Sequence, residues 1–207
     1  MQTLLLHPKS IYKFRYDDHA QVVNQFTTIV EKNRQDYLPN AVISNDQIDI
    51  TCIMRPETFS GKILDWLSFL KTSFSQILDH EDLVHEGFEV ELMWLVYQKE
   101  LNTTGSEPHS HANSVFSGIY YVDVSENCFT EFLEDDHIFR RSNHVLRKNG
   151  SVYGPQVETI NFSSGDLIFF RSDMVHKAVH SHEKRIVIAF NINLKGLGSL
   201  NSLSYKK

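Results

Sequence analysis

The stretch Arg185-Ile-Val-Ile-Ala-Phe-Asn-Ile-Asn-Leu194 alternates between two kinds of side chain, which is typical of a β-strand with one buried face. One face is strongly apolar and carries Ile186, Ile188, Phe190 and Ile192. Arg185 shares the opposite face with Val187, Ala189 and Asn191. Turn residues separate six further β-rich runs, which predict strands at 88–98, 115–124, 129–133, 157–162, 166–171 and 175–180.

The first half of the chain has helical spacing instead. After a capping pair of aspartates at 17–18, apolar residues recur every three or four positions until Pro39 ends the helix. A second amphipathic helix is predicted over about 58–79, and one or two short strands within 41–55. Residues 1–16 are expected to be extended. Two helices followed by many strands indicate an α+β fold, a barrel or jelly roll with helices against one face.

Neither a linker nor an internal repeat interrupts the sequence, so we expect a single domain over 1–207. Within it, residues 1–86 would supply helical support and leading strands. Residues 87–195 would form the jelly-roll core, and residues 196–207 a flexible tail.

Composition narrows the classes of protein that need to be considered. Of 207 residues, 41% are hydrophobic and 22% charged, which is usual for a globular protein. The formal net charge of −6 makes nucleic-acid binding an unfavoured function, and two cysteines are too few for a disulfide framework. Because no run is long and apolar enough for a membrane span, we expect a cytoplasmic protein without membrane contact.

Three histidines are the candidate metal ligands. His109 and His111 are two residues apart, so on an extended segment both side chains point to one face. His176 opens a late strand that could lie opposite them. Imidazole ligands suit iron, zinc, copper and nickel, and three ligands leave positions open for substrate. His180 and His182 have the same parity as His176, but they lie in a polar turn where solvent exposure is the simpler interpretation.

Two segments resemble the Fe(II)/2-oxoglutarate-dependent oxygenases. His109-Ser-His-Ala-Asn-Ser-Val-Phe-Ser-Gly-Ile-Tyr-Tyr-Val-Asp123 is similar to the metal-binding strand of that superfamily. It is closest to the family of phages and bacteria with His-x-His followed by Ser-Gly-(Val/Ile)-Tyr-Tyr. Gly165-Asp-Leu-Ile-Phe-Phe-Arg-Ser-Asp-Met-Val-His176, followed by Arg185–Asn191, is similar to the second metal strand and the cosubstrate strand. The resemblance implies a double-stranded β-helix.

The resemblance also implies roles for individual residues. His109 and His176 would hold Fe(II), Arg185 would bind the distal carboxylate of 2-oxoglutarate, and Tyr121 would point at the same carboxylate. His111, two residues from His109, is taken as the third metal ligand. A guanidinium suits that task because it pairs with a carboxylate in a bidentate, charge-assisted manner. By composition alone, Tyr121 could equally be a core aromatic residue. Trp94 and Tyr97, on the preceding strand, could line the pocket or pack in the core.

His111 occupies the position where the superfamily usually has a carboxylate. Asp123 cannot replace it, since twelve extended residues span about 40 Å. Glu107 has the right parity and could be a ligand or could orient an imidazole N–H. A different register would make His111 the first ligand and Asn113 the substitute for the acid. We rank the three histidines first.

The resemblance thus implies a dioxygenase that uses Fe(II), 2-oxoglutarate and O2 and hydroxylates a C–H bond, releasing succinate and CO2. One alternative is a cupin-like enzyme that uses three histidines and iron, zinc or copper without 2-oxoglutarate. The other is a non-catalytic binding module. The substrate, a small molecule or a peptidyl residue, and the oligomeric state stay open at this stage.

Overall fold

The computed structural model describes residues 10–37, 50–55, 59–98, 106, 108–111, 113–126, 128–133, 157–179 and 185–196. Two helices and nine strands lie within these residues. They are β1 (Ile11–Arg15), α1 (His19–Tyr37), β2 (Ile50–Met54), α2 (Lys62–His80), β3 (Gly87–Gln98), β4 (Phe116–Val124), β5 (Phe129–Leu133), β6 (Val157–Asn161), β7 (Asp166–Arg171), β8 (Val175–Val179) and β9 (Arg185–Lys195).

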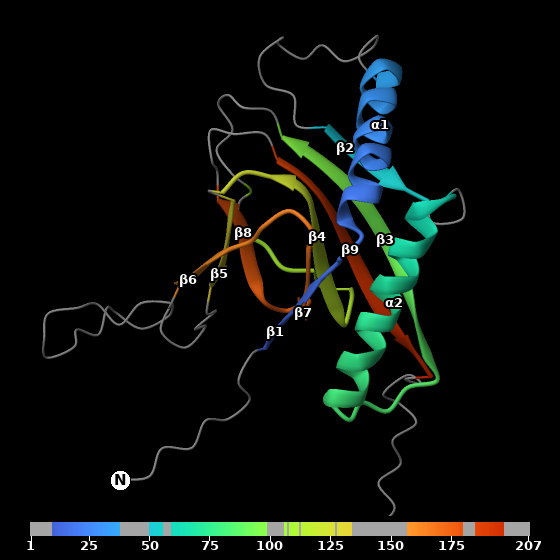
Figure 1. Cartoon of the computed structure of the whole chain (residues 1–207). Coiled ribbons are helices and arrows are strands. Elements are labelled where there is room, and N and C mark those ends of the chain that lie inside the picture. Colours follow the sequence, from blue (N-terminus) through green and yellow to red (C-terminus); the bar gives the residue numbers. More distant parts are fainter. Residues whose placement is uncertain are drawn as a thin grey trace, which may run out of the picture.

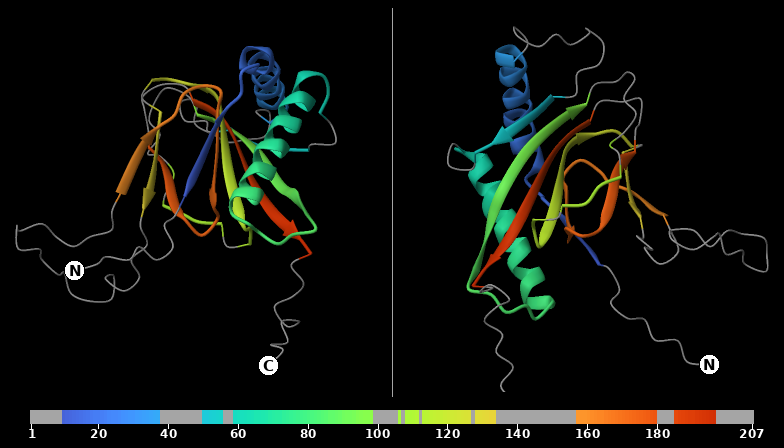
Figure 2. Two further views of the ribbon diagram at one scale, coloured as in Figure 1. Left: turned by 60° about the horizontal axis from the view of Figure 1, so that its bottom comes forward. Right: turned by 180° about the vertical axis from the view of Figure 1, so that it is seen from behind.

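The strands form two antiparallel sheets. The major sheet has the order β1-β7-β4-β9-β3-β2, and the minor sheet has the order β6-β5-β8. Figures 1 and 2 show the minor sheet on one side of the major sheet and both helices on the other. An isolated antiparallel bridge between His109 and His176 joins the segment before β4 to β8. The described strands thus make two layers joined at their rim, not a closed barrel.

The helices cover the outer face of the major sheet because α2 is apolar along one side. Its buried residues recur at intervals of three and four, which turns a single stripe toward the sheet. Phe74 of this stripe contacts Phe88, Phe116 and Phe169, with ring centroids 4.8, 5.2 and 5.5 Å away. These contacts belong to the larger hydrophobic core, which also takes the apolar face of β9. Neither described helix has an apolar stretch sufficient to span a membrane.

A smaller core lies between the two sheets. Its buried residues come from the inner faces of β4, β7 and β9, from β5, and from positions next to the ends of the minor-sheet strands: Ile119, Tyr121, Cys128, Phe132, Phe162, Ile168, Phe170, Met174 and Val187. Alternation along β9 therefore sends Ile186 and Ile188 to the helix side and Val187 to the space between the sheets. The functional site occupies this inner space.

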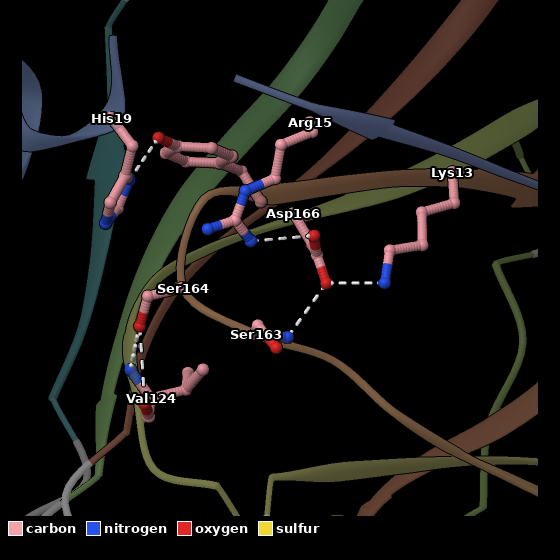
Figure 3. A network of polar contacts seen from close by, with 8 residues as sticks. Lys13, Arg15, His19, Val124, Ser163, Ser164 and Asp166 are labelled. Atoms are coloured by element: carbon pink, nitrogen blue, oxygen red, sulfur yellow. Dashed lines mark hydrogen bonds and ion pairs between the residues drawn. The ribbon is translucent and has the colours of Figure 1, made fainter. Parts of the chain in front are cut away.

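A polar network fixes the turn before β7 and the edge strand β1 (Figure 3). The Asp166 carboxylate accepts hydrogen bonds from Arg15 at 3.1 Å and from the backbone N–H of Ser163 at 2.8 Å, and it pairs with Lys13 at 2.7 Å. Nearby, the Ser164 hydroxyl bonds the backbone N–H and C=O of Val124. This network adds side-chain contacts to the backbone pairing of β1 with β7.

The predicted elements and the observed ones agree closely. The strands at 129–133 and 166–171 have the predicted bounds, and the other ends differ by at most four residues. The first segment, expected only to be extended, is partly a strand of the major sheet, because β1 pairs with β7 over its whole length. The predictions for residues 41–49 and for the tail after 196 lie outside the described residues.

Candidate metal centre

Three imidazoles converge between the sheets. One ring nitrogen from each of His109, His111 and His176 lies within 4.8 Å of the others. The ring centroid of His109 is 4.5 Å from that of His176, and the centroid of His111 is 5.3 Å from both. The cluster contains no carboxylate among the described residues. Neutral nitrogen donors in this number suit a first-row transition metal, with coordination positions left open.

Backbone hydrogen bonds bring the two distant segments together. The N–H of His109 donates to the carbonyl of His176 at 3.0 Å, and the N–H of His176 donates to the carbonyl of His109 at 2.9 Å. The N–H of His111 donates to the carbonyl of Ser172 at 2.8 Å. The first ligand segment is therefore attached to the β7–β8 region at two points.

His176 is set up to bind through one particular nitrogen. Its Nδ1–H donates to the carbonyl of Met174 at 3.0 Å, so the lone pair is on Nε2. His176 is 4% exposed, and burial lowers its pKa to about 4. The hydrogen bond to Met174 acts against this shift, and the charges of His109, His111 and Arg185 add to it. Burial also lowers the pKa of His111. Both imidazoles are neutral at physiological pH, as metal ligation requires.

Trp94 forms the wall beside the second histidine. Its ring centroid lies 5.7 Å from that of His111, at an interplanar angle of 33°. Tyr97, three residues further along β3, packs on the opposite face in the larger core. Of the two aromatic residues considered for the pocket, the structure places only Trp94 in it.

A cavity of about 170 Å³ opens in front of the imidazoles. Its wall includes all three histidines, Trp94 and, further along β3 and β9, the polar side chains of Gln98 and Arg185. Between these two ends lie Val96 and Val187. The cavity thus has a cationic end and a metal-binding end separated by an apolar middle.

The cationic end is a buried guanidinium with neutral neighbours. Arg185 is 7% exposed, and its Nη1 donates to Oε1 of Gln98 at 3.2 Å. Its Nε has no hydrogen-bond partner. The Cys128 sulfur accepts a hydrogen bond from the guanidinium, and burial raises the pKa of that thiol, which is therefore uncharged. No carboxylate of a described residue pairs with Arg185. A buried charge of this kind is costly unless a ligand anion pairs with it.

Tyr121 lies next to Arg185 but not on the cavity wall. The guanidinium carbon sits 6.0 Å from the centre of its ring, and its hydroxyl bonds the Thr130 hydroxyl at 2.8 Å. Thr130 lines the cavity. Burial raises the pKa of Tyr121, so the phenol stays protonated. The structure therefore brings Tyr121 to the cationic end, with Thr130 as the hydroxyl that faces the cavity.

Sequence reasoning missed a group of polar residues beside the histidines. The Ser117 hydroxyl, on the cavity wall, bonds the Ser172 hydroxyl at 2.8 Å and donates to Oδ1 of Asn191 at 3.0 Å. Alternation placed Asn191 on the same face as Arg185, but nothing in the sequence gives the pairing of β4 with β7 and β9 that joins Asn191 to Ser117.

One candidate residue lies apart from the cluster, and three others lie outside the described residues. Asn113, the acid substitute of the alternative register, is exposed, and its carbonyl accepts a hydrogen bond from Asn193. Glu107, His180 and His182 lie outside the described residues.

Comparison with known proteins identifies a related family. Residues 92–191 match the family described as "Putative 2OG-Fe(II) oxygenase". These residues include β4 to β8, most of β3 and β9, the three histidines, Tyr121 and Arg185. The family uses Fe(II), 2-oxoglutarate and O2. A comparison with curated protein sequences found no match.

Solved structures of the same fold cover most of the chain. A prolyl-4-hydroxylase from Pseudomonas putida superposes with a TM-score of 0.58 at 12% identity, covering 91% of this chain and 94% of that one. The epimerase SnoN, in complex with Fe3+, alpha ketoglutarate and nogalamycin RO, gives 0.56 at 10% identity, with 96% and 87% covered. HygX from Streptomyces hygroscopicus, with nickel and 2-oxoglutarate bound, gives 0.53 at 11% identity, with 90% and 83% covered. The expected double-stranded β-helix with supporting helices is confirmed.

Proposed function

The chain is related through residues 92–191 to the 2OG-Fe(II) oxygenases, a class of oxidoreductases, and on that premise we propose that it is a 2-oxoglutarate-dependent dioxygenase that hydroxylates a C–H bond. The substrate would be a small molecule or a peptidyl residue, and the products of 2-oxoglutarate would be succinate and CO2. Bound Fe(II) would supply the activation of O2 that is coupled to this oxidative decarboxylation.

His109, His111 and His176 are the proposed ligands. Three neutral imidazoles leave both positive charges of Fe(II) uncompensated, which favours the arrival of a dianionic cosubstrate. The hydrogen bond from His176 to the Met174 carbonyl holds the ring in one orientation and tautomer. The burial of His176 would keep water away from a metal ion held by its ring.

The uncompensated guanidinium of Arg185 is the single observation that supports 2-oxoglutarate most strongly. It is buried in the same cavity as the three imidazoles, and the side chains between them are apolar. A diacid with one carboxylate near the metal and the other on Arg185 would satisfy both ends. Tyr121 would act at the same end by fixing the Thr130 hydroxyl.

The third imidazole also favours a second candidate function. A site of three histidines without a carboxylate ligand suits a cupin-like metalloenzyme that holds iron, zinc or copper and does not use 2-oxoglutarate. The two functions differ in what they require of Arg185. In the cupin-like enzyme its positive charge would have no cosubstrate to bind.

Calorimetric titration with 2-oxoglutarate and assay of succinate release separate these functions. We expect Zn2+-loaded protein to bind 2-oxoglutarate, and Fe(II)-loaded protein under O2 to release succinate. Arg185→Ala should abolish 2-oxoglutarate binding while the metal stays bound. Arg171→Ala, which removes an exposed arginine at the end of β7, is the matched control and should change neither. Metal binding without 2-oxoglutarate binding would favour the cupin-like enzyme, and absence of metal binding would favour a binding module.

A further inference from the structure

Gln98 lies at the cationic end of the cavity, and the proposed reaction gives it no role. It is the last residue of β3 and lies directly opposite Arg185, the first residue of β9. Both side chains are buried, at 8% and 7% exposure, and both line the cavity. A long polar side chain in such a position is expected to have a specific partner.

The chemistry of the pair fixes how the amide is oriented. A guanidinium only donates hydrogen bonds, so the atom that faces Arg185 Nη1 at 3.2 Å must be the amide oxygen. The amide nitrogen of Gln98, which carries two donors, is therefore turned away from Arg185. The oxygen restrains the guanidinium without neutralising its charge.

The same protein shows what a structural arginine looks like. Arg15 pairs with the Asp166 carboxylate at 3.1 Å, and that carboxylate also binds Lys13. There a carboxylate of the protein itself pairs with the guanidinium. At Arg185 the corresponding neighbour is an amide, although a glutamate differs from glutamine at a single terminal atom and would have matched the charge.

We propose that Gln98 is a positioning residue for the cosubstrate: it holds the Arg185 guanidinium with a neutral acceptor and so keeps its positive charge for the distal carboxylate of 2-oxoglutarate. This inference rests on the proposed function. With the Thr130 hydroxyl and the Gln98 amide beside the guanidinium, this end of the cavity binds a carboxylate and disfavours a cation or an apolar group.

The decisive variant is Gln98→Glu. Its carboxylate would pair with Arg185 and occupy the guanidinium from within the protein, so the affinity for 2-oxoglutarate should fall about 100-fold. Gln98→Met, which keeps the length but not the acceptor, should weaken binding about 10-fold because the guanidinium loses its restraint. Zn2+ affinity should stay within about threefold in both variants, since neither touches the imidazoles.

Gln76→Glu is the matched control. It makes the same chemical change, glutamine to glutamate, on the exposed side of α2 and away from the cavity. If the added net charge alone weakened 2-oxoglutarate binding, both acidic variants would weaken it equally. We expect Gln76→Glu to keep the affinity within about threefold of the wild type.

Calorimetric titration of 2-oxoglutarate into Zn2+-loaded protein measures each affinity, and circular dichroism verifies that each variant is folded. If folded Gln98→Glu binds 2-oxoglutarate as tightly as the wild type, the role of Gln98 is overturned and the proposed function is left intact. A wild type that binds Zn2+ but no 2-oxoglutarate would overturn the proposed function, and the role of Gln98 with it. Selective loss of 2-oxoglutarate binding in Gln98→Glu would support the role of Gln98 and the use of 2-oxoglutarate as cosubstrate.

Discussion

At the scale of single residues, the three candidate ligands differ in how firmly they are held. His176 is buried, contacts Phe170 with ring centroids 4.7 Å apart, and donates to the Met174 carbonyl. His111 is half-buried against Trp94, and His109 is exposed. His176, the most buried of the three, therefore has the most fixed geometry. A metal ion entering from solvent would pass the more exposed His109 and His111 first.

We predict that His176→Ala weakens Zn2+ binding by more than about 100-fold. Loss of a residue that only orients a metal ligand costs up to about 100-fold, and this substitution removes a ligand itself. Calorimetry on folded protein measures the loss. His85→Ala removes an exposed histidine whose ring bonds the N–H of Gly87, and it should leave the Zn2+ affinity unchanged. Equal Zn2+ affinity in His176→Ala and the wild type would mean that the ion binds elsewhere.

Asp166 gives a prediction about acid stability. Burial alone would raise the pKa of its carboxyl, but hydrogen bonds from Lys13, the Ser163 N–H and Arg15 outweigh burial and lower that pKa below its usual value. The ionised carboxylate therefore stabilises the fold above the pKa of the unfolded chain, and this stabilisation is lost as the pH falls through the lower pKa of the folded protein.

Asp166→Asn should reduce the free energy of unfolding at pH 7 by about 2 kcal/mol, the scale of a lost hydrogen bond to a charged group. The difference from the wild type should shrink as the pH falls below about 4, the ordinary pKa of an aspartate in the unfolded chain, and shrink further through the lower pKa of the folded protein. Urea unfolding at several pH values measures it. A difference that stays constant down to pH 2 would contradict this account.

At the scale of elements, β4 is the strand on which the site depends, because it pairs with β7 on one side and β9 on the other. Gly118, the third residue of β4, leaves room for the Phe190 ring. A Cβ at this position would lie 2.3 Å from Cζ of Phe190 and 2.7 Å from the carbonyl oxygen of Ile168. The second contact is with backbone, which cannot move without shifting β7.

Gly118→Ala should therefore destabilise the protein by about 3 kcal/mol, the upper end of the usual cost of overpacking. Denaturant unfolding measures the change. In the double variant with Phe190→Leu, the contact with the ring is relieved and the contact with Ile168 remains, so we expect a partial rescue. Additive effects of the two substitutions would show that the ring does not cause the strain.

Alternation along the strands made much of this predictable. Because side chains change face at every residue, the sequence alone placed Arg185, Val187 and Ala189 together, and His109 with His111. The register between two strands, in contrast, cannot be predicted from the sequence of either strand alone. The pairing of β1 with β7, the contact of Trp94 with His111 and the position of Gln98 opposite Arg185 therefore appeared only in the structure.

At the scale of the whole molecule, packing and chemistry lie on opposite faces of one sheet. The larger core fills the space under the helices and contains none of the three histidines or Arg185. The smaller core surrounds the cavity. Stability and ligand binding should therefore respond separately to substitutions on the helix side.

Phe74→Ala tests this separation. Removal of a fully buried ring that packs against three other phenylalanines should lower the free energy of unfolding by about 3–5 kcal/mol. At a temperature where the variant is still folded, its Zn2+ affinity should match that of the wild type. Ser75→Ala, on the exposed side of α2, is the control and should affect neither quantity. A parallel loss of Zn2+ affinity in Phe74→Ala would show that the two faces are coupled.

The reciprocal backbone hydrogen bonds between His109 and His176 have a consequence for how the protein would acquire its ion. Because the main chain already joins these two positions, convergence of the donors does not wait for a cation to arrive. Folding can finish first, and loading becomes a later event that can be reversed with a chelator while the tertiary structure survives. This distinguishes the protein from small zinc domains, which unfold when their ion is withdrawn.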